Sequence, residues 1–402
     1  TNDFRINNGT FETGANTLQV SGNSYITGIL SINNSDGIAN LQNTDLSGGT
    51  ITGSTATGTA TIAGNLSMPG GNGTVGRVNL TVNGTTTVNA SRTFTITSST
   101  GSKLFKGKVT IESSAEWNNA GNAAIEFQNG LIFNGSVFVS GTGQYLFSQN
   151  NQSVEGNSPL SFDGDVVVGS DINLTNKNSG AGTGITINKS LNGTNLASAF
   201  TNEGILTYQP AGTNSMPMVT GVLWALFNPN TIYYSRNGNQ NIYSNIQYHH
   251  LVISGSGTKS LGNDISVNGN LTIENPAILK SNNFSINLKG NWTDNNPLNG
   301  FTEDNGKVYF SGNTPQTISK SGTETFYNLE INNPQGINLS LDNISISNEF
   351  IMRQGNIQTN GNTVIMTQGN VSFLDYTAGT IVGKFQRAIN QTDAEYLFPV
   401  GT

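Results

Sequence analysis

The sequence predicts an all-β fold, an elongated right-handed parallel β-helix in which short strands stack coil upon coil. Apolar residues alternate with polar ones between Tyr248 and Ile273, as expected for short strands that bury one face. Runs of this kind recur along the chain, separated by Gly, Asn and Ser, without a 3.6-residue helical pattern. We expect roughly 16 to 20 coils of about 20 to 25 residues each.

The coils are expected to fall into four segments. Residues 1–207 form N-terminal coils, with alternating runs such as Leu80 with Val82 and Val109 with Ile111. Residues 208–232 break the rhythm, because they hold three of the ten prolines and two of the five methionines, and we interpret them as an irregular insertion. Residues 233–376 form C-terminal coils with the clearest repeats. Residues 377–402 are terminal strands that we expect to lead into a further domain.

A longer repeat supports the solenoid. Three segments share an aromatic start and a glutamine, and aligning Gln152, Gln240 and Gln316 gives spacings of 88 (240 minus 152) and 76 (316 minus 240). Trp117 and Trp292 occupy corresponding places, and each has the parity of its apolar neighbours. Both tryptophans are therefore predicted to lie in the core or at a coil edge.

The composition restricts the partners. Only 10% of residues are charged, and the formal net charge is -7 with 17 Lys and Arg, which disfavours nucleic acid and anionic membranes. No apolar run is long enough for a transmembrane helix, and the first residues lack the features of a signal peptide, which we expect to have been removed. Neutral Asn, Ser and Thr suit a stack, because like charges on successive coils would repel at about 4.8 Å.

Several segments carry a resemblance, namely YHHLVISGSGTKSLGNDISVNGNLTI, FSINLKGNWTDN, VYFSGNTPQTI and the ending EYLFPVGT. They resemble the β-helical repeats of large secreted cell-surface proteins of Bacteroidetes, especially Flavobacterium-like species. The resemblance is clearest over residues 233–402, and the first hundred residues match only in style. His249 and His250 depart from it, since the family usually has Tyr and Asn there.

The resemblance implies an extracellular, outer-membrane-associated adhesin-like or stalk protein. It also implies export by the type IX secretion system through a sorting domain downstream of Thr402. The family supplies no catalytic residues that could be transferred to this chain. The expected function is therefore that of a non-catalytic structural or adhesive solenoid that binds glycans or other surface polymers.

One aromatic cluster lies outside the repeat pattern. Trp224, Phe227, Tyr233 and Tyr234 are candidate ligand-binding residues, because an exposed apolar patch rimmed with Asn and Ser suits a glycan or protein contact. The alternative interpretation is that this segment covers the core or a coil edge.

A structural calcium ion is a second candidate feature, and no other cofactor is expected. Asp163, Asp165 and Asp171 offer carboxylates, although Phe162 and Val166 claim the inner face, so the first two aspartates should point outward into solvent. His249 and His250 are neighbours on a predicted strand and should point to opposite faces, which argues against a shared metal.

Two other functions are weighed as alternatives. A polysaccharide lyase or hydrolase would need converging carboxylates, yet only the fragment Asn43-Thr44-Asp45 resembles part of a polygalacturonase signature. Ice binding is a remote alternative, suggested by the alternate threonines at positions 55–61 and 93–97, which also simply suit outward strand positions.

Overall fold

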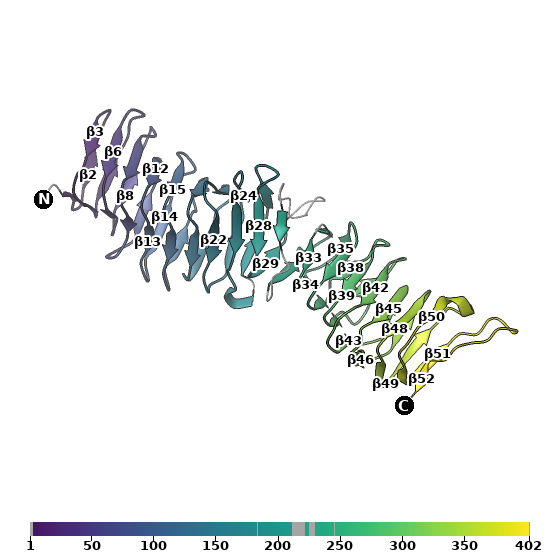
Figure 1. The fold of residues 1–402 in the computed structure, drawn as a ribbon. Coiled ribbons are helices and arrows are strands. Elements are labelled where there is room, and N and C mark those ends of the chain that lie inside the picture. Colours follow the sequence, from purple (N-terminus) through teal and green to yellow (C-terminus); the bar gives the residue numbers. More distant parts are fainter. Residues whose placement is uncertain (1–2, 183, 211–221, 225–229, 245, 402) are drawn as a thin grey trace. The chain divides into compact units, whose positions relative to one another are not determined.

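The computed structural model describes residues 3–182, 184–210, 222–224, 230–244 and 246–401. About 48% of the described residues lie in β-strands, and these residues contain no α-helix, only the short 3-10 turns η1 (Gly180–Gly182) and η2 (Val371–Phe373). Parallel strands stack into a β-solenoid of about 18 turns (Figure 1). The predicted fold class is therefore confirmed, and the right-handed sense of the coil stays a prediction.

The chain divides into two compact units. Unit 1 reaches Pro210 and includes Val222 and Leu223, and unit 2 contains the described residues from Trp224 onward. The division falls inside the segment 208–232 that was interpreted as an insertion, of which residues 211–221 and 225–229 lie outside the described residues. Strand β30 (Val222–Trp224) lies at this division.

Unit 1 has three faces, each made of strands that pair in parallel with the equivalent strands of the coils before and after. The first face comprises β1 (Phe4–Ile6), β4 (Ser24–Ile26), β7 (Thr44–Asp45), β10 (Leu66–Ser67), β13 (Thr86–Val88), β16 (Val109–Ile111), β19 (Leu131–Phe133), β22 (Gln152–Glu155), β25 (Asn173–Asn176) and β28 (Ala199–Asn202). The second comprises β2 (Thr10–Glu12), β5 (Ile29–Ser31), β8 (Thr50–Thr52), β11 (Gly73–Val75), β14 (Thr93–Ile96), β17 (Glu116–Asn118) and β20 (Val137–Val139), followed by a separate ladder of β23 (Leu160–Phe162), β26 (Ile185–Ile187) and β29 (Ile205–Tyr208). The third comprises β3 (Thr17–Gln19), β6 (Ile38–Leu41), β9 (Thr59–Ile62), β12 (Asn79–Val82), β15 (Lys103–Phe105), β18 (Ile125–Phe127), β21 (Tyr145–Phe147), β24 (Asp165–Val168) and β27 (Ser190–Gly193).

Unit 2 repeats the arrangement. One face comprises β31 (Thr231–Tyr234), β34 (His250–Ile253), β37 (Leu271–Ile273), β40 (Trp292–Asp294), β43 (Gln316–Lys320), β46 (Ile337–Ser340) and the long β49 (Ile357–Met366). The next comprises β32 (Gln240–Ile242), β35 (Thr258–Leu261), β38 (Ile278–Lys280) and β41 (Phe301–Thr302), and, separately, β44 (Glu324–Phe326) and β47 (Ile344–Ile346), which reach β49. The third comprises β33 (Gln247–Tyr248), β36 (Ile265–Val267), β39 (Ile286–Leu288), β42 (Lys307–Phe310), β45 (Asn328–Asn332), β48 (Phe350–Gln354) and β50 (Leu374–Tyr376). β51 (Ile381–Arg387) pairs with β49, and β52 (Val400–Gly401) pairs with β51.

Coil length is close to the expected value. Phe4 pairs with Ser24, a sequence separation of 20 (24 minus 4), and Leu174 pairs with Phe200, a separation of 26 (200 minus 174). Longer turns at the corners account for the difference, because the short strands hardly change in length.

Among the described residues, no helix is long and apolar enough to cross a membrane.

The core is a set of rows that run from coil to coil. In β12, Leu80 and Val82 are fully buried while Asn79 and Thr81 face outward, as period-two patterning predicts. Val82 stands in register with Ile62 on one side and Phe105 on the other, so apolar side chains lie directly above one another. Burial of this kind stabilises the fold by about 25 cal/mol per Å² of apolar surface.

The glutamines of the long repeat are buried corner residues. Gln152 accepts a hydrogen bond from the Gly130 backbone N–H at 2.9 Å and donates to the Phe127 carbonyl at 3.1 Å. Gln316 is fully buried and donates to the carbonyls of Leu288 and Gly290. Gln240, also buried, accepts from the Arg236 N–H at 3.3 Å. The three glutamines thus share one role, which is to form hydrogen bonds with backbone groups at a tight corner.

Asparagines form a second ladder outside the core. The Asn43 amide donates to Asn23 Oδ1 at 3.3 Å, and Asn43 Oδ1 in turn accepts from the Asn65 backbone N–H at 3.0 Å. The Thr85 N–H continues the series by donating to Asn65 Oδ1 at 2.9 Å. Neutral amides therefore link successive coils, which explains the scarcity of charge.

One strand reverses the expected parity. Val137 and Val139 follow the apolar alternation of the sequence, yet they are 41% and 39% exposed. Phe138 between them turns inward and stacks on Trp117, with ring centres 6.2 Å apart and planes within 13°. Phe138 pairs in register with Trp117 on the neighbouring coil, and its contact with the indole places it on the inner face and both valines on the outer face.

Candidate ligand-binding groove

A groove lies on the outer surface of unit 2, on the face formed by β36, β39 and β42. Ser266 pairs with Asn287, and Asn287 pairs with Tyr309, so these three outward residues form a row across three coils. The residues on either side of each in its strand are buried, and this fixes the row on the outside.

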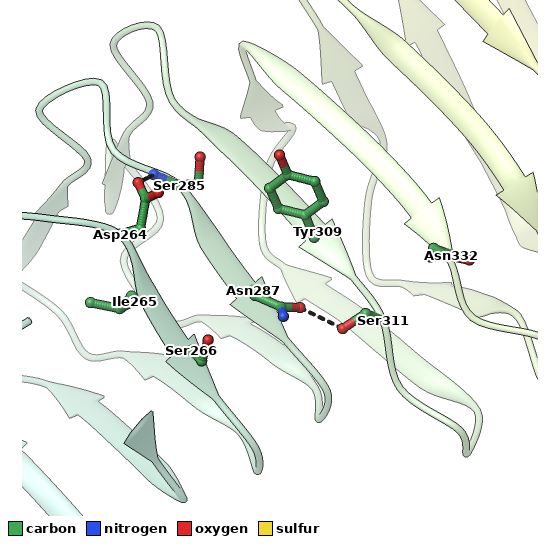
Figure 2. Close-up of a pocket in the computed structure, with 8 residues that line it drawn as sticks. All are labelled: Asp264, Ile265, Ser266, Ser285, Asn287, Tyr309, Ser311 and Asn332. Atoms are coloured by element: carbon green, nitrogen blue, oxygen red, sulfur yellow. Dashed lines mark hydrogen bonds between the residues drawn. The ribbon is translucent and has the colours of Figure 1, made fainter. Parts of the chain in front are cut away.

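The groove has a volume of about 390 Å³ and is lined mostly by polar residues (Figure 2). Ile265 is the buried residue of the lining, at 3% exposure. The lining residues are Asp264, Ile265, Ser266, Ser285, Asn287, Tyr309, Ser311 and Asn332.

Two internal hydrogen bonds hold the lining in place. The Ser285 backbone N–H donates to Asp264 Oδ1 at 2.7 Å, and the Ser311 hydroxyl donates to Asn287 Oδ1 (Figure 2). In the second bond the amide oxygen of Asn287 is the acceptor, so the NH₂ group of the same side chain can still donate to a ligand.

Tyr309 is flanked by a charged group. The Lys307 ammonium lies 5.5 Å from the centre of the Tyr309 ring, within the range of a cation–π contact. The same ammonium is 2.8 Å from Glu349 and 3.9 Å from Glu330. Lys307 is therefore paired with carboxylates of later coils while its ammonium lies near the Tyr309 ring.

This arrangement suits a polyhydroxylated ligand. Hydroxyl and amide groups both donate and accept hydrogen bonds, as sugar hydroxyls do. The half-exposed ring of Tyr309 supplies a flat apolar surface against which the C–H face of a sugar ring can pack. The groove thus combines a few placed polar groups with one aromatic contact.

The four predicted ligand-binding aromatics have separate outcomes. Phe227 and the side chain of Trp224 lie outside the described residues. Tyr233 is half-exposed on β31. Tyr234 is fully buried, and its hydroxyl lies 2.8 Å from that of Tyr248, so the prediction that it contacts a ligand is wrong. Desolvation raises the pKa of Tyr234 well above its ordinary value.

Tyr233 occupies the same repeat position as Tyr309. Each tyrosine lies seven residues before the repeat glutamine, counting 240 minus 233 and 316 minus 309. Tyr145 has the same offset from Gln152 but is fully buried. The last buried aromatic residue before the glutamine is five residues away in this segment (152 minus 147) but six residues away in the other two (240 minus 234 and 316 minus 310), so the turn is one residue shorter here. A shift of one residue reverses which face a side chain occupies. The repeat was therefore a signal in the sequence that could have indicated Tyr309.

The predicted calcium ligands point outward but bind protein groups. Asp163 accepts from the Asn188 amide at 2.6 Å, and Asp171 from the Asn195 amide at 3.3 Å. Asp165 forms an ion pair of 2.7 Å with Lys189. Burial alone would raise the pKa of Asp165, but the bonds from Lys189 and Ser190 outweigh it and lower that pKa. Within the described part of the chain, no three or more His, Cys, Asp or Glu side chains are grouped to hold a metal.

The two histidines lie together, contrary to the expectation that they face opposite sides. Their rings are 4.3 Å apart and steeply inclined to each other, because Tyr248 and Leu251 take the buried positions on either side of them at the corner where β34 begins. His250 Nδ1 accepts from the Asn270 N–H at 3.0 Å. Desolvation lowers the pKa of both rings, and for His250 the neighbouring His249 lowers it further.

The threonine rows are partly continuous. Thr50 pairs with Thr74, and Thr74 with Thr95, so three outward threonines stand in line on three coils. On the third face Thr61 lies between Asn40 and Thr81. Ice binding therefore stays a prediction.

Comparison with known proteins provides no assignment, because no family model, no curated protein and no solved structure matches the chain.

Proposed function

We propose that the chain is a non-catalytic, extracellular adhesive solenoid that binds a neutral glycan along the outer face of unit 2. The observation that carries this proposal is the groove of about 390 Å³ in which Tyr309 stands in line with Asn287 and Ser266. An aromatic face beside amide and hydroxyl groups is the chemistry that recognises a sugar chain.

The periodicity of the fold favours a polymer over a single sugar. The groove residues lie on successive strands about 4.8 Å apart, so an extended chain that crosses the strands meets a new set of polar groups on each coil. The row continues past Tyr309 to Glu330, which is paired in register with it and lies 3.9 Å from Lys307.

The charge of the groove favours binding over catalysis. Its lining includes one carboxylate, Asp264, whereas glycoside hydrolysis by the common route uses two that flank the bond. Asp264 is exposed, and its carboxylate already accepts a hydrogen bond from the Ser285 backbone N–H. The polysaccharide lyase or hydrolase is therefore the weaker alternative.

The proposed location is the cell surface. This location is supported by the resemblance of residues 233–402 to secreted repeat proteins. The proposal also includes the export route that the resemblance implies, through a sorting domain downstream of this sequence. A stack of coils with few charges is suited to hold a binding surface away from the membrane.

A binding experiment with matched tyrosine variants tests the proposal. Affinity electrophoresis through gels that contain neutral polysaccharides would compare the unaltered chain, Tyr309→Ala and Tyr25→Ala. Tyr25 is a suitable control because it is a half-buried, outward strand tyrosine in unit 1 with a cation, Arg5, 3.9 Å from its ring centre. We expect retardation to fall about tenfold in Tyr309→Ala and to persist in Tyr25→Ala, a loss of about 1.4 kcal/mol.

Equal retardation of all three proteins would contradict the groove as the binding site. Release of reducing or unsaturated sugar ends during incubation would contradict the non-catalytic assignment.

A further inference from the structure

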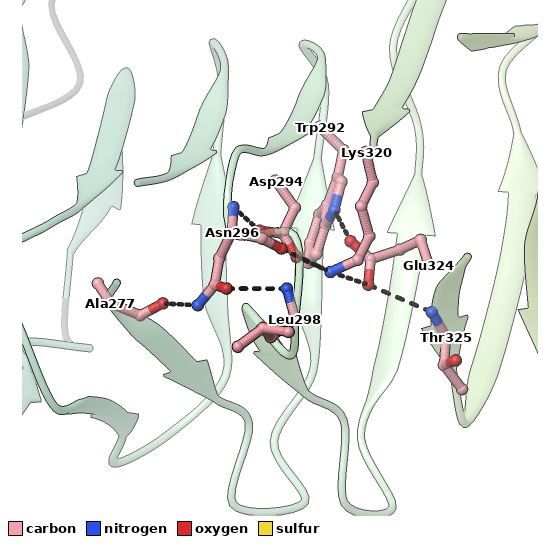
Figure 3. A network of polar contacts seen from close by, with 8 residues as sticks. All are labelled: Ala277, Trp292, Asp294, Asn296, Leu298, Lys320, Glu324 and Thr325. Carbon is pink, nitrogen blue, oxygen red and sulfur yellow. Dashed lines mark hydrogen bonds and ion pairs between the residues drawn. The ribbon is translucent and has the colours of Figure 1, made fainter. Parts of the chain in front are cut away.

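A cluster of ionisable side chains lies inside the core of unit 2. Asp294 ends β40 and Lys320 ends β43, and the two residues pair in register on neighbouring coils, both with side chains in the core (Figure 3). Glu324, which begins β44, completes the group. The three residues are 2%, 5% and 2% exposed.

The contacts are short and directed. Lys320 Nζ lies 2.5 Å from Asp294 Oδ2, which places the carboxyl carbon of Asp294 one C–O bond further on. The same nitrogen lies 4.0 Å from Glu324 Oε1 and donates to the Asn296 carbonyl at 3.2 Å. The other carboxyl oxygen, Asp294 Oδ1, accepts from the Asn296 backbone N–H at 2.9 Å.

The surroundings of the cluster are largely aromatic. Trp292 Nε1 donates to Glu324 Oε2 at 2.8 Å, and its ring lies 4.9 Å from Phe301 and 5.4 Å from Phe326. Because two carboxyl groups share one amine in a site of low polarity, one carboxyl must carry a proton. Burial raises the pKa of Glu324 to about 8 against the opposing charge of Lys320, and Asp294 adds to the increase, so Glu324 is the protonated acid at neutral pH.

Unit 1 provides an uncharged counterpart. Trp117 corresponds to Trp292 and Asn119 to Asp294, and both belong to a buried network. There the indole donates to the Tyr145 hydroxyl at 3.2 Å, and the Asn119 amide donates to the Ser140 carbonyl at 2.8 Å. Neutral groups thus form the buried hydrogen bonds at the equivalent corner of unit 1. The corner itself therefore does not require an amine and two acids.

We propose that Lys320 and Asp294 condense spontaneously in the folded chain to form an intramolecular amide (isopeptide) bond between Nζ and Cγ, with Glu324 carrying protons. The inference goes beyond the proposed function and does not depend on it.

The reaction begins with proton transfer inside the ion pair. Lys320 gives a proton to Asp294 across the 2.5 Å contact, which leaves a neutral amine beside a neutral acid. Exclusion from water favours this neutral pair more than it would be favoured in solvent. The amine lone pair then attacks Asp294 Cγ, and the electrons of the C=O bond move to Oδ1, where the Asn296 N–H stabilises the developing charge.

Glu324 then completes the exchange of protons. Its protonated carboxyl group gives a proton to Oδ2, which leaves as water when the Cγ–O bond breaks, and the resulting carboxylate takes a proton from the attached nitrogen. The sum is one ammonium and one carboxylate converted into one amide and one water, with Glu324 unchanged and no oxidant or reductant required. Fixed orientation supplies the rate, since well-placed groups react as if present at about 10⁵–10⁸ M.

Mass spectrometry of the intact chain tests the proposal directly. We expect the purified protein to weigh one water less than its sequence. Trypsin should fail to cleave after Lys320, because an amidated lysine is not recognised, and the digest should contain one branched peptide that joins the segments around Asp294 and Lys320.

Three variants separate this bond from other losses of water. Lys320→Met and Glu324→Gln should each have the full mass calculated from its own sequence. Lys259→Met should still weigh one water less than its sequence. Lys259 is the matched control because it is also buried but its ammonium donates to backbone carbonyls, those of Arg236, Gly238 and Ser256. The β-type circular dichroism of each variant checks that it is folded.

A wild-type chain of full sequence mass that is cleaved after Lys320 would overturn the proposal. A deficit that persists in Lys320→Met would also overturn it, since the water would then come from another reaction such as cyclisation at an Asp-Gly step. A cross-link that still forms in Glu324→Gln would overturn the role given to Glu324.

Discussion

Gln152 in unit 1 and Gln316 in unit 2 perform the same structural task at a sequence separation of 164 (316 minus 152). Each side chain is buried at the start of a strand, accepts from a glycine N–H at 2.9 Å, and donates to carbonyls of the preceding coil. The repeat in the sequence therefore reflects a corner whose backbone groups are cut off from water and must be paired by a side chain.

Replacing this glutamine should destabilise unit 2. Gln316→Leu would leave the Gly312 N–H without its acceptor and the Gly290 carbonyl without its side-chain donor, at a cost of about 1–3 kcal/mol for each group left unpaired. The melting temperature of the variant should fall clearly below that of the parent. Gln19→Leu, at an exposed strand position, should melt within error of the parent, and equal melting of the two variants would contradict this account.

The buried lysines should make the free energy of unfolding depend on pH in the alkaline range. Burial lowers the pKa of Lys259 to about 8 in the folded chain, against 10.5 for the ordinary value. Between these values the unfolded chain binds more protons, so the free energy of unfolding should rise with pH across that window. Urea unfolding at a series of pH values would measure the rise.

The lysine variant provides the control for that measurement. Lys259→Met should have a shallower rise between pH 8 and 10.5 than the parent. The comparison must be made as a difference, because Lys103 has the same lowered pKa and the buried tyrosines titrate above pH 10. Parallel curves for parent and variant would contradict the prediction.

Trp117 should be the most sensitive position of the unit 1 core. Its ring contacts Phe94, Phe105 and Phe127 at centre distances of 5.4, 5.7 and 5.9 Å, so truncation leaves a large cavity. Trp117→Ala is expected to lower the free energy of unfolding by about 3–5 kcal/mol. Hydrogen exchange should accelerate first in β14 and β17, the strands around the cavity. Phe11→Ala, at a residue that is 40% exposed, should have a much smaller effect.

Close coil stacking should exclude even a methyl group at Gly164. A Cβ there would lie 1.8 Å from the carbonyl oxygen of Gly143 on the neighbouring coil, and this backbone atom cannot turn aside. Gly164→Ala should therefore destabilise unit 1 by about 1–3 kcal/mol or more. Gly262→Ala is the control, because the nearest atom to its Cβ is a serine hydroxyl at 3.6 Å. Calorimetric melting of both variants would distinguish them.

Much of the fold could be predicted from local pattern. The alternation around Leu80 and Val82 indicates a strand with one buried face, and the parity of Trp117 and Trp292 places both in the core, where they are. These predictions succeed because each depends only on which face a side chain takes within a short strand. Val137 and Val139 show the limit, since the bulk of Phe138 beside Trp117 overrides the alternation.

The sites, in contrast, depend on residues that lie a whole coil apart. Asp294 meets Lys320 at a sequence separation of 26 (320 minus 294), and Asn287 meets Tyr309 at a separation of 22 (309 minus 287). Because the coils differ in length, no constant spacing in the sequence indicates which side chains will stand in register. The sequence by itself determined the strands, their buried faces and the repeat. Only the tertiary structure decided which residues meet, because the turn lengths at the corners set the register between coils.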